Sequence, residues 1–439
     1  MRVLSTTESS QPGQPAGNLR SVSSPWPSYE EVVRRTGRPA VAVVFGVGHY
    51  QGMGVLRGLG RMGVPVVAIG EKDSVGFWSR YACESHVSPD PHEQPEEFLR
   101  LLVTIGRRLK AEGKNAVLFP TRDSVVELFA KRCEELREFF ICHSPDYEVI
   151  RNCSNKEAQI RLARELNVPA PQTYFDNELD SLHRDLAGGR LQFPLILKAK
   201  KELPTELKKK FRLIILNNDA QLRQALADAA AQNIAFLIQE VISGEDDQLY
   251  TFGSCLARNG KLTAVFTGRK LRQQPPRFGV CRVGESVPVE PIVRDGERLL
   301  RGLKFHGISQ VEYKFDARDG RYKLMEVNPR AWAWIGLAVA MGVNIPYAFF
   351  CDALGVDISP QSMPSLRGVY ISLYDDLYWS LKARDGRAWA HCFKDYDLIV
   401  EPFYSRDDRM PGLIHFTRCG VLLAQMGFNQ VLRALGLRR

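Results

Sequence analysis

Two glutamates and an asparagine near residue 320 have the types and spacing of ligands for a divalent metal ion. Apolar and polar side chains alternate through 311–328, which predicts two β-strands joined by a turn. If the turn is a three-residue loop ending at Gly320 in the left-handed conformation, Glu312 lies opposite Glu326, and Asn328 projects from the same face. Like charges on neighbouring strands destabilise a sheet unless a cation compensates them. Two carboxylates and an amide oxygen suit Mg²⁺, which substrate phosphates usually complete.

Two alternatives compete with this metal site. A two-residue Asp-Gly turn would shift the pairing by one residue and send the two glutamates to opposite faces. The segment could also be an ordinary hairpin with a solvated acidic face. The second strand runs directly into Asn-Pro-Arg at 328–330, and the uncharged stretch that follows favours a buried setting. We therefore expect the acidic face to border a cleft.

The composition is that of a globular protein with several domains. The chain has 439 residues, 44% of them hydrophobic and 25% charged, and a net charge of +9. A basic chain favours anionic partners, but the 59 Lys and Arg residues are interspersed with acids, so we expect no nucleic-acid partner. The nine cysteines include no C-x-x-C, which argues against a disulfide framework or a zinc site.

The two ends and one apolar stretch raise the question of membranes and targeting. Residues 1–38 are rich in Ser, Pro, Gln and Arg, which predicts a disordered tail rather than a secretory signal, and we expect a cytoplasmic protein. The uncharged stretch 331–351 is interrupted by Gly342, Asn344 and Pro346, which indicates two short buried helices instead of a membrane span.

Residues 39–152 alternate between apolar strands and helical segments. The pattern starts at Ala40 with a strand, a glycine loop, a helix and a second strand, and further strands are expected at 116–119 and 139–142. This alternation predicts a doubly wound parallel sheet with helices on both faces. The glycine loop is not a dinucleotide fingerprint, because Gln51 stands where the third glycine of G-x-G-x-x-G belongs.

The next region places lysines where an anion could bind. Asn155 precedes and caps a predicted helix that begins at Lys156. A buried strand at 193–198 delivers Lys198 at its end, where a lysine either binds an anion or reaches solvent. The basic segment 200–210 is expected to be a mobile lid, with a solvated charge run as the alternative.

Together these landmarks resemble the ATP-grasp superfamily of carboxylate-amine ligases, and most of all its D-aspartate ligase type. The likeness rests on the order of four features along the chain: the lysines, the interlobe strand, GRKLRQQPPRFG at 268–279 and EVNPR at 326–330. The resemblance implies a mixed α/β and α+β fold, with a Rossmann-like domain before a two-lobed ATP-grasp domain. The expected units are 1–38, 39–152, 153–238 (first lobe), 239–356 (second lobe with the metal site) and a C-terminal extension, 357–439.

The resemblance also implies roles for individual residues. Lys156 and Lys198 would hold the nucleotide phosphates. Backbone groups of the interlobe segment would contact adenine, and an acid after it would bind ribose, Asp246 in preference to Glu245. The adenine-contacting segment comprises Gln239, Glu240, Val241 and Ile242.

The implied metal ligands are Glu312, Glu326 and Asn328, the same three residues that the hairpin geometry indicates. Arg330 would bind reacting anionic groups. Lys270, or else Arg272, would approach the transferred phosphate or the acceptor.

The resemblance implies an ATP- and Mg²⁺-dependent enzyme, with Mn²⁺ as an alternative metal. It would convert a carboxylate into an acyl phosphate that an amine then attacks, forming an amide and releasing ADP and phosphate. Two alternatives remain: a non-catalytic ATP-binding sensor or scaffold of the same shape, and an NAD(P)-dependent oxidoreductase.

The identities of the two small-molecule substrates and the oligomeric state are not readable from the sequence, so a homodimer stays open. The basic helix expected at 420–439 is interpreted as core packing, with peripheral membrane contact as the alternative.

Overall fold

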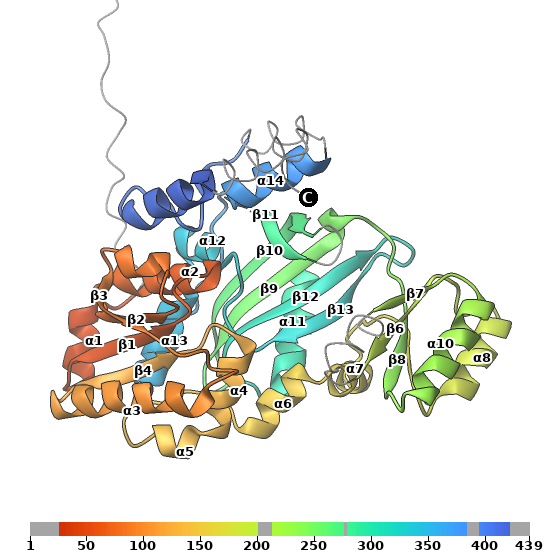
Figure 1. Ribbon diagram of the computed structural model, residues 1–439, viewed down its shortest axis with the longest axis horizontal. Coiled ribbons are helices and arrows are strands. Elements are labelled where there is room, and N and C mark those ends of the chain that lie inside the picture. Colours follow the sequence, from red (N-terminus) through yellow and green to blue (C-terminus); the bar gives the residue numbers. More distant parts are fainter. Residues whose placement is uncertain (1–25, 201–212, 276–278, 384–394, 422–439) are drawn as a thin grey trace, which may run out of the picture.

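The computed structural model describes residues 26–200, 213–275, 279–383 and 395–421, and these residues form three β-sheets. Figure 1 shows the N-terminal sheet, the large central sheet and the small sheet arranged in a row. The C-terminal elements lie along one side of the central sheet and reach the N-terminal helices.

The N-terminal sheet is fully parallel, with strand order β3-β2-β1-β4. Its helices cover both faces, because α2 packs on Ala42 and Val44 whereas α3 packs with Val41 and Val43 on the other face. The predicted doubly wound sheet is therefore confirmed. The elements are α1 (Tyr29–Thr36), β1 (Ala40–Phe45), α2 (Tyr50–Gly60), β2 (Val66–Gly70), η1 (Val75–Trp78), β3 (Ala82–Val87), α3 (Pro95–Ala111), β4 (Asn115–Phe119), α4 (Asp123–Lys131), α5 (Cys133–Leu136) and α6 (Tyr147–Ser154).

Two details of this region differ from the sequence-based expectation. The tail does not extend to residue 38, because Ser28 caps α1 and the helix buries Val32. The strand expected at 139–142 is reduced to a single bridge between Ile141 and Val117.

The small sheet is antiparallel, with order β5-β8-β6-β7. Helices α8 and α10 cover it, and Asn155 caps α7 through hydrogen bonds from two backbone amides, as expected. The elements are α7 (Lys156–Glu165), β5 (Thr173–Phe175), α8 (Leu179–Ala187), β6 (Leu195–Ala199), β7 (Ile214–Leu216), α10 (Asp219–Ala231) and β8 (Phe236–Glu240).

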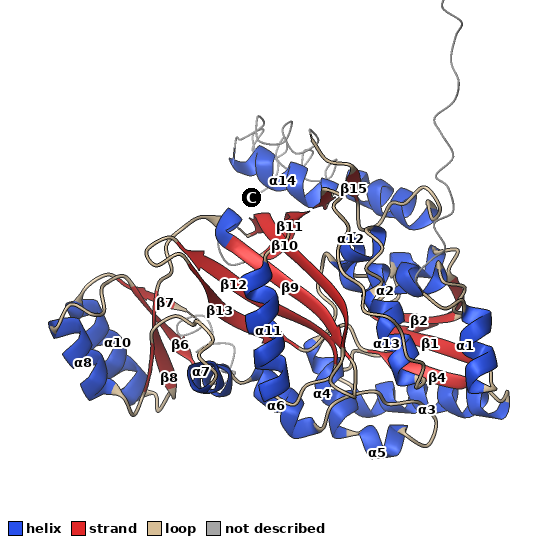
Figure 2. Ribbon diagram, turned by 180° about the vertical axis from the view of Figure 1, so that it is seen from behind, coloured by secondary structure: helices blue, strands red, loops and turns tan. Residues whose placement is uncertain are grey.

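The central sheet has seven strands in the order β13-β12-β9-β10-β11-β14-β15. Residues beyond 357 belong to it, because β14 pairs with β11 and β15 continues the sheet. The elements are η2 (Asp246–Gln248), β9 (Leu249–Leu256), β10 (Leu262–Gln274), β11 (Val280–Ser286), α11 (Glu290–Gly302), β12 (Gly307–Asp316), β13 (Arg321–Asn328), α12 (Ile335–Ala340), α13 (Ile345–Ala353), β14 (Gly368–Ile371), α14 (Leu373–Ala383) and β15 (Leu398–Val400). Helix α11 covers one face of this sheet (Figure 2).

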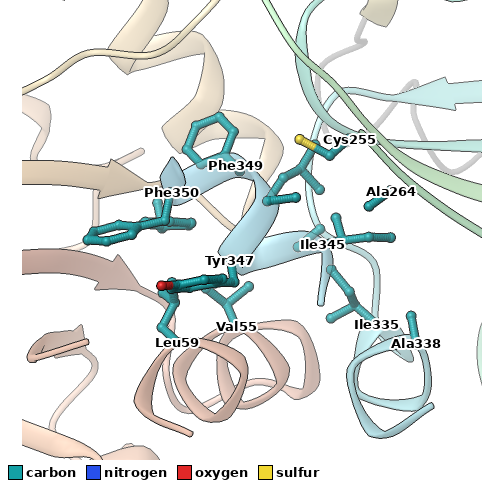
Figure 3. Close-up of a cluster of buried hydrophobic side chains, with 14 of the residues drawn as sticks. Val55, Leu59, Cys255, Ala264, Ile335, Ala338, Ile345, Tyr347, Phe349 and Phe350 are labelled. Atoms are coloured by element: carbon teal, nitrogen blue, oxygen red, sulfur yellow. The ribbon is translucent and has the colours of Figure 1, made fainter. Parts of the chain in front are cut away.

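The other face of the central sheet shares a core with the N-terminal sheet. Helices α12 and α13 fill the space between them, and Figure 3 shows Ile335, Tyr347 and Phe350 packed with Val55 and Leu59 of α2. The uncharged stretch thus forms two short buried helices, as predicted. Within the described ranges, no helix combines the length and the apolar character needed to cross a bilayer.

Candidate functional site

The hairpin β12–β13 brings Glu312 directly opposite Glu326, although by a different route from the one expected. The turn is a four-residue loop, because Asp316 pairs with Arg321, and Gly320 takes the left-handed conformation with a φ of 69°. Pairing continued from that turn would place Met325 opposite Glu312. A β-bulge shifts the register between Glu312 and Tyr313 and restores the opposition of the two glutamates.

A network of short polar contacts surrounds the two glutamates. Asn328 lies opposite Gln310, and its Nδ2 donates to Gln310 Oε1 at 3.3 Å and to Glu326 Oε1 at 3.2 Å. Gln310 Nε2 in turn donates to Glu312 Oε1 at 2.9 Å and to Thr251 Oγ1 at 3.1 Å. The structure therefore brings the three expected metal ligands together on one face of the sheet.

Lys270 forms an ion pair with one member of this acidic pair. Its Nζ lies 2.7 Å from Glu312 Oε1, and both side chains are largely buried. Burial raises the pKa of Glu312; Lys270 opposes that shift, and the neighbouring Glu326 adds to it. Burial alone would lower the pKa of Lys270, but Glu312, Cys281 and Glu326 together outweigh it, and the pKa is raised.

The donor set fits a hard divalent cation. Two opposed carboxylates share one lysine, so a second positive charge would relieve their repulsion. Among the described residues, no three His, Cys, Asp or Glu side chains gather around one point. A metal ion here would thus need the amide oxygen of Asn328 and oxygens from a substrate, which is the pattern typical of Mg²⁺.

One lysine of the small sheet and one of helix α7 act electrostatically on the acidic pair. Lys198 lies in β6, and its Nζ donates to the amide oxygen of Gln239 at 3.2 Å. The pKa of Lys198 is lowered to about 8, mainly by burial and also by Lys156 at the start of α7, whereas Glu326 acts in the opposite direction. Lys156 is exposed and makes no ion pair within the described chain. The two expected phosphate-binding lysines and one expected metal ligand are therefore electrostatic neighbours.

The expected adenine-binding segment, Gln239 to Ile242, lies where the small sheet passes into the central sheet. The side chain of Glu240 accepts from the amide of Gln172 at 2.8 Å and from Arg318 at 2.7 Å. The amide of Val241 donates to Pro194 O at 3.3 Å, and the side chain of Ile242 is buried.

The acids after this segment differ in their surroundings. Asp246 accepts from the backbone and the side chain of Gln273, at 3.1 and 2.9 Å, and so connects η2 to the end of β10. Glu245 is exposed. Asp246 is thus partly engaged within the protein, and its expected role at ribose remains a prediction.

Arg330 links the central sheet to the N-terminal sheet. Its guanidinium binds Asp123 with two hydrogen bonds, of 2.7 and 2.9 Å, and also donates to Asn328 Oδ1 at 3.5 Å. Asp123 begins α4, just beyond the carboxyl end of β4, where parallel sheets commonly bind ligands.

Other expected site groups lie apart from this face or beyond the described residues. Arg272 binds Asp376 of α14 through two hydrogen bonds, of 2.8 and 2.6 Å. A register shift between Lys270 and Arg272 separates the directions of these two side chains, so of the two only Lys270 contacts the acidic pair. Apart from Lys200, the lid expected at 200–210 lies outside the described residues, and so does most of the basic helix expected at 420–439.

Sequence reasoning missed two members of the site. Gln310 precedes Glu312 by two residues on the same strand, so the period-two alternation could have placed it on the same face. Asp123 follows a predicted buried strand of the parallel sheet, and its position at the carboxyl end of that strand could have indicated it.

The three sheets have the arrangement expected for the ATP-grasp fold, and comparisons with solved structures confirm the prediction of the fold. The L-amino acid ligase from Bacillus licheniformis superposes with a TM-score of 0.52 at 15% identity over 72% of this chain and 74% of that one. The biotin carboxylase domain of Hydrogenobacter thermophilus 2-oxoglutarate carboxylase, solved with MgADP, superposes with a TM-score of 0.56 at 17% identity, over 76% and 74%.

One curated protein is similar in sequence. The D-aspartate ligase of Enterococcus faecium (strain Aus0004) is 23% identical over 262 residues, which are 56% of this chain and 61% of the ligase. The match thus spans about three fifths of that relative. No family model matches the chain.

Proposed function

We propose that the protein is an ATP- and Mg²⁺-dependent ligase that converts a carboxylate into an acyl phosphate and joins it to an amine. This proposal rests on one observation: two opposed carboxylates on the central sheet, Glu312 and Glu326, have Lys198 of the small sheet and Lys156 of α7 as electrostatic neighbours. A nucleotide triphosphate with its metal ion complements both sets of charges.

The substrate class follows from the similar proteins. Both the D-aspartate ligase and the L-amino acid ligase are named for amino acid substrates. We infer that the carboxylate substrate is an amino acid. The dinucleotide alternative gains no support from the glycine loop, because Gln51 stands in place of the third glycine and its side chain donates to Thr121 O.

The first step transfers the terminal phosphoryl group of ATP. An oxygen of the substrate carboxylate attacks phosphorus, and the bond to ADP breaks, with ADP keeping the electron pair. Lys198 and Lys156 neutralise phosphate oxygens, and Arg330 holds an anionic group of the substrate beside Asn328. Mg²⁺ held by Glu312, Glu326 and Asn328 would stabilise the charge on the transferred group.

The second step forms the amide. The amine nitrogen attacks the acyl carbon, and the bond to phosphate breaks, with phosphate keeping the electron pair. Of the two protons that an ammonium group loses, one goes to phosphate and the other to water. Since water competes with the amine for the acyl phosphate, the site must exclude solvent while this intermediate is present.

The test is ADP and phosphate release with pooled amino acids and pooled amines. The proposal expects release that needs one member of each pool and Mg²⁺. Glu326→Gln should lower it roughly 10³-fold, whereas Glu297→Gln, which lies on α11 and pairs with Arg301, should leave it unchanged. Release that ignores both pools would contradict the ligase function and favour an ATP-binding sensor or scaffold.

A further inference from the structure

Gln310 connects three strands of the central sheet at the acidic pair. Its side-chain nitrogen, Nε2, donates to Glu312 Oε1 at 2.9 Å and to Thr251 Oγ1 at 3.1 Å, and its Oε1 accepts from Asn328 Nδ2 at 3.3 Å. These partners lie on β12, β9 and β13. Gln310 is 4% exposed, so water has little access to replace these bonds. Both amide hydrogens of the side chain are thus used within the protein.

The carboxylates fix the direction of both amides in this network. An ionised carboxylate only accepts hydrogen bonds. Glu312 lies 2.7 Å from the ammonium of Lys270, and it faces the nitrogen end of the Gln310 amide. Glu326 Oε1 lies 3.2 Å from Asn328 Nδ2, which turns the amide oxygen of Asn328 away from this carboxylate. Reversing either amide would place a carbonyl oxygen against a carboxylate oxygen.

The network engages one side of each expected metal ligand and leaves one oxygen. Among the described residues, both bonds of the Glu312 carboxylate end at Oε1. Asn328 bonds Glu326 at Oε1 through its nitrogen. Oδ1 of Asn328 has only a long contact, of 3.5 Å, with Arg330. Oε2 of each glutamate and Oδ1 of the asparagine are therefore left for a metal ion.

A site that offers single oxygens suits one kind of cation. Mg²⁺ demands a near-ideal octahedron at about 2.1 Å, which a carboxylate binding through both oxygens would distort. Ca²⁺ takes about six to eight oxygens and accepts both oxygens of one carboxylate. The hydrogen bond from Gln310 to Oε1 of Glu312 therefore opposes the mode of binding that favours Ca²⁺.

Packing also holds Gln310 in place. It pairs with Asn328 on one neighbouring strand and with Gly253 on the other. A Cβ at Gly253 would lie 2.1 Å from the ring of Trp332, so this ring covers the glycine. The ring fills the space that the Gln310 side chain would enter by turning away from Asn328.

We propose that Gln310 is a positioning residue of the metal site, which orients Glu312 and Asn328 so that each presents one oxygen, and that it thereby makes the site favour Mg²⁺ over Ca²⁺. The inference rests on the proposed function, because it needs the metal site named there. Gln310 acts through the atoms that it holds and contacts neither the metal ion nor a substrate.

Two substitutions separate the parts of this role. Gln310→Met keeps the length of the side chain and removes all three hydrogen bonds, while Glu312 keeps its bond to Lys270. Gln310→Glu keeps the shape and an acceptor for Asn328, but it cannot donate to Glu312 and it adds a carboxylate. The second variant keeps the proposal testable if the first fails to fold.

Ser309→Ala is the matched control. Ser309 precedes Gln310 on β12, so its side chain lies on the opposite face of the sheet. There its hydroxyl shares a hydrogen bond of 2.8 Å with Ser254, and both serines are fully buried. The control thus removes a buried hydrogen bond next to Gln310 without changing the network around the glutamates.

The experiment measures binding of β,γ-imido-ATP, which is not hydrolysed at this bond, to each full-length protein by isothermal titration. The titration is done with saturating Mg²⁺, with saturating Ca²⁺, and with a chelator and no metal ion. The readout is the dissociation constant with Ca²⁺ divided by that with Mg²⁺. Thermal unfolding without nucleotide reports the cost of each substitution to the fold.

The parent should bind the nucleotide more tightly with Mg²⁺ than with Ca²⁺ or without a metal ion. Gln310→Met should lower the ratio about tenfold, the scale of losing a residue that orients metal ligands. Gln310→Glu should lower it at least as far, because an added carboxylate favours the ion with more coordination places. Ser309→Ala should change the ratio less than about twofold, even if it unfolds at as low a temperature as Gln310→Met. Binding without a metal ion should be the same in the parent, Gln310→Met and Ser309→Ala.

Three results would overturn the positioning role and leave the metal site and the ligase standing. They are a parent that prefers neither ion, a ratio unchanged in both Gln310 variants, and an equal loss of affinity with both ions, which a general disturbance of the sheet would cause. If the parent binds the nucleotide no more tightly with Mg²⁺ than without a metal ion, the metal site is wrong, and the proposed function fails together with this inference.

Discussion

The small sheet and the central sheet differ in the sign of the charge that lacks a full set of ion-pair partners. On the small sheet, the one hydrogen bond of the Lys198 ammonium to another described residue is to an amide oxygen, although Lys200, two residues later, lies 2.8 Å from both Glu157 and Asp176. On the central sheet, Glu312 and Glu326 share one lysine. Among the described residues, Lys198 of the small sheet therefore has no carboxylate in an ion pair with it, and the two glutamates of the central sheet have one lysine in contact.

This difference indicates that the charges of Lys198, Glu312 and Glu326 contribute to ligand binding more than to the stability of the fold. Ordinary ion pairs, such as that of Lys200, were available to the same strand. Leaving Lys198 without a carboxylate costs stability, because burial disfavours its charged form. Groups perturbed in this way cluster at functional sites. Four predictions follow the comparison from its strongest to its weakest consequence.

Glu326→Gln should have the largest effect on turnover, because it removes one negative charge from the pair of glutamates on the central sheet. Turnover should fall roughly 10³-fold, the scale of a lost metal ligand worth several kcal/mol. The free protein should become slightly more stable, by about 0.5 kcal/mol, since the repulsion from Glu312 is gone. ADP release and thermal unfolding without nucleotide measure the two effects. A variant that turns over normally, or one that is destabilised, would remove Glu326 from the metal site.

Lys198→Ala removes the buried positive charge of the small sheet and should weaken the binding of MgATP. Loss of a charge-assisted hydrogen bond to phosphate costs about 2 kcal/mol, which weakens MgATP binding about 30-fold. Thermal stabilisation by MgATP should shrink accordingly. Lys323→Ala is the matched control, because Lys323 pairs with Asp319 at the tip of the hairpin. Equal stabilisation of the Lys198 variant and the parent would show that the lysine does not touch the nucleotide.

The pH dependence of MgATP binding should report the same lysine. The pKa of Lys198 in the free protein is lowered to about 8, and a bound phosphate would raise it. Binding must then take up a proton above pH 8, so affinity should fall by up to about tenfold per pH unit between pH 8 and the raised pKa. Isothermal titration from pH 7 to 9.5 measures it. Lys198→Arg should flatten the profile, because arginine stays protonated; an unflattened profile would assign the titration to another group.

The smallest effect is expected at the contact between the central and N-terminal sheets. Asp123→Asn removes the ionic partner of Arg330, but Asp123 is 59% exposed, so unfolding free energy should change by less than about 1 kcal/mol. KM for the carboxylate should rise a few-fold because Arg330 is held less firmly. A large loss of stability in chemical denaturation would instead make this ion pair a structural connection.

The parts of the fold with strong local signals were predictable. The apolar strands of the N-terminal sheet, the capped start of α7 and the two short helices in 335–353 each follow from periodicity or from a single stop or start residue. The opposition of Glu312 and Glu326 was predicted correctly, but from a three-residue turn that is not there. Turn length and bulges depend on packing between strands, which local sequence does not record.

Other features were out of reach for the same reason. The ion pair between Arg330 and Asp123 joins residues 207 positions apart. The union of β14 and β15 with the central sheet depends on pairing with β11, whereas the chain after 357 reads locally as a separate extension. Contacts of this kind arise only when distant elements pack together.

The extra residue in β13 shifts the phase of the strand's alternation midway. Before it, Leu324 pairs with Tyr313 and lies in the hydrophobic core under α11; after it, Glu326 pairs with Glu312 in the polar network. Numbered two apart, these side chains would share a face in a regular strand. If this hairpin were transferred to another protein with the bulge at Met325 removed, either a carboxylate would enter the hydrophobic core or a leucine would enter the cleft. The bulge must therefore be transferred together with the metal-binding residues.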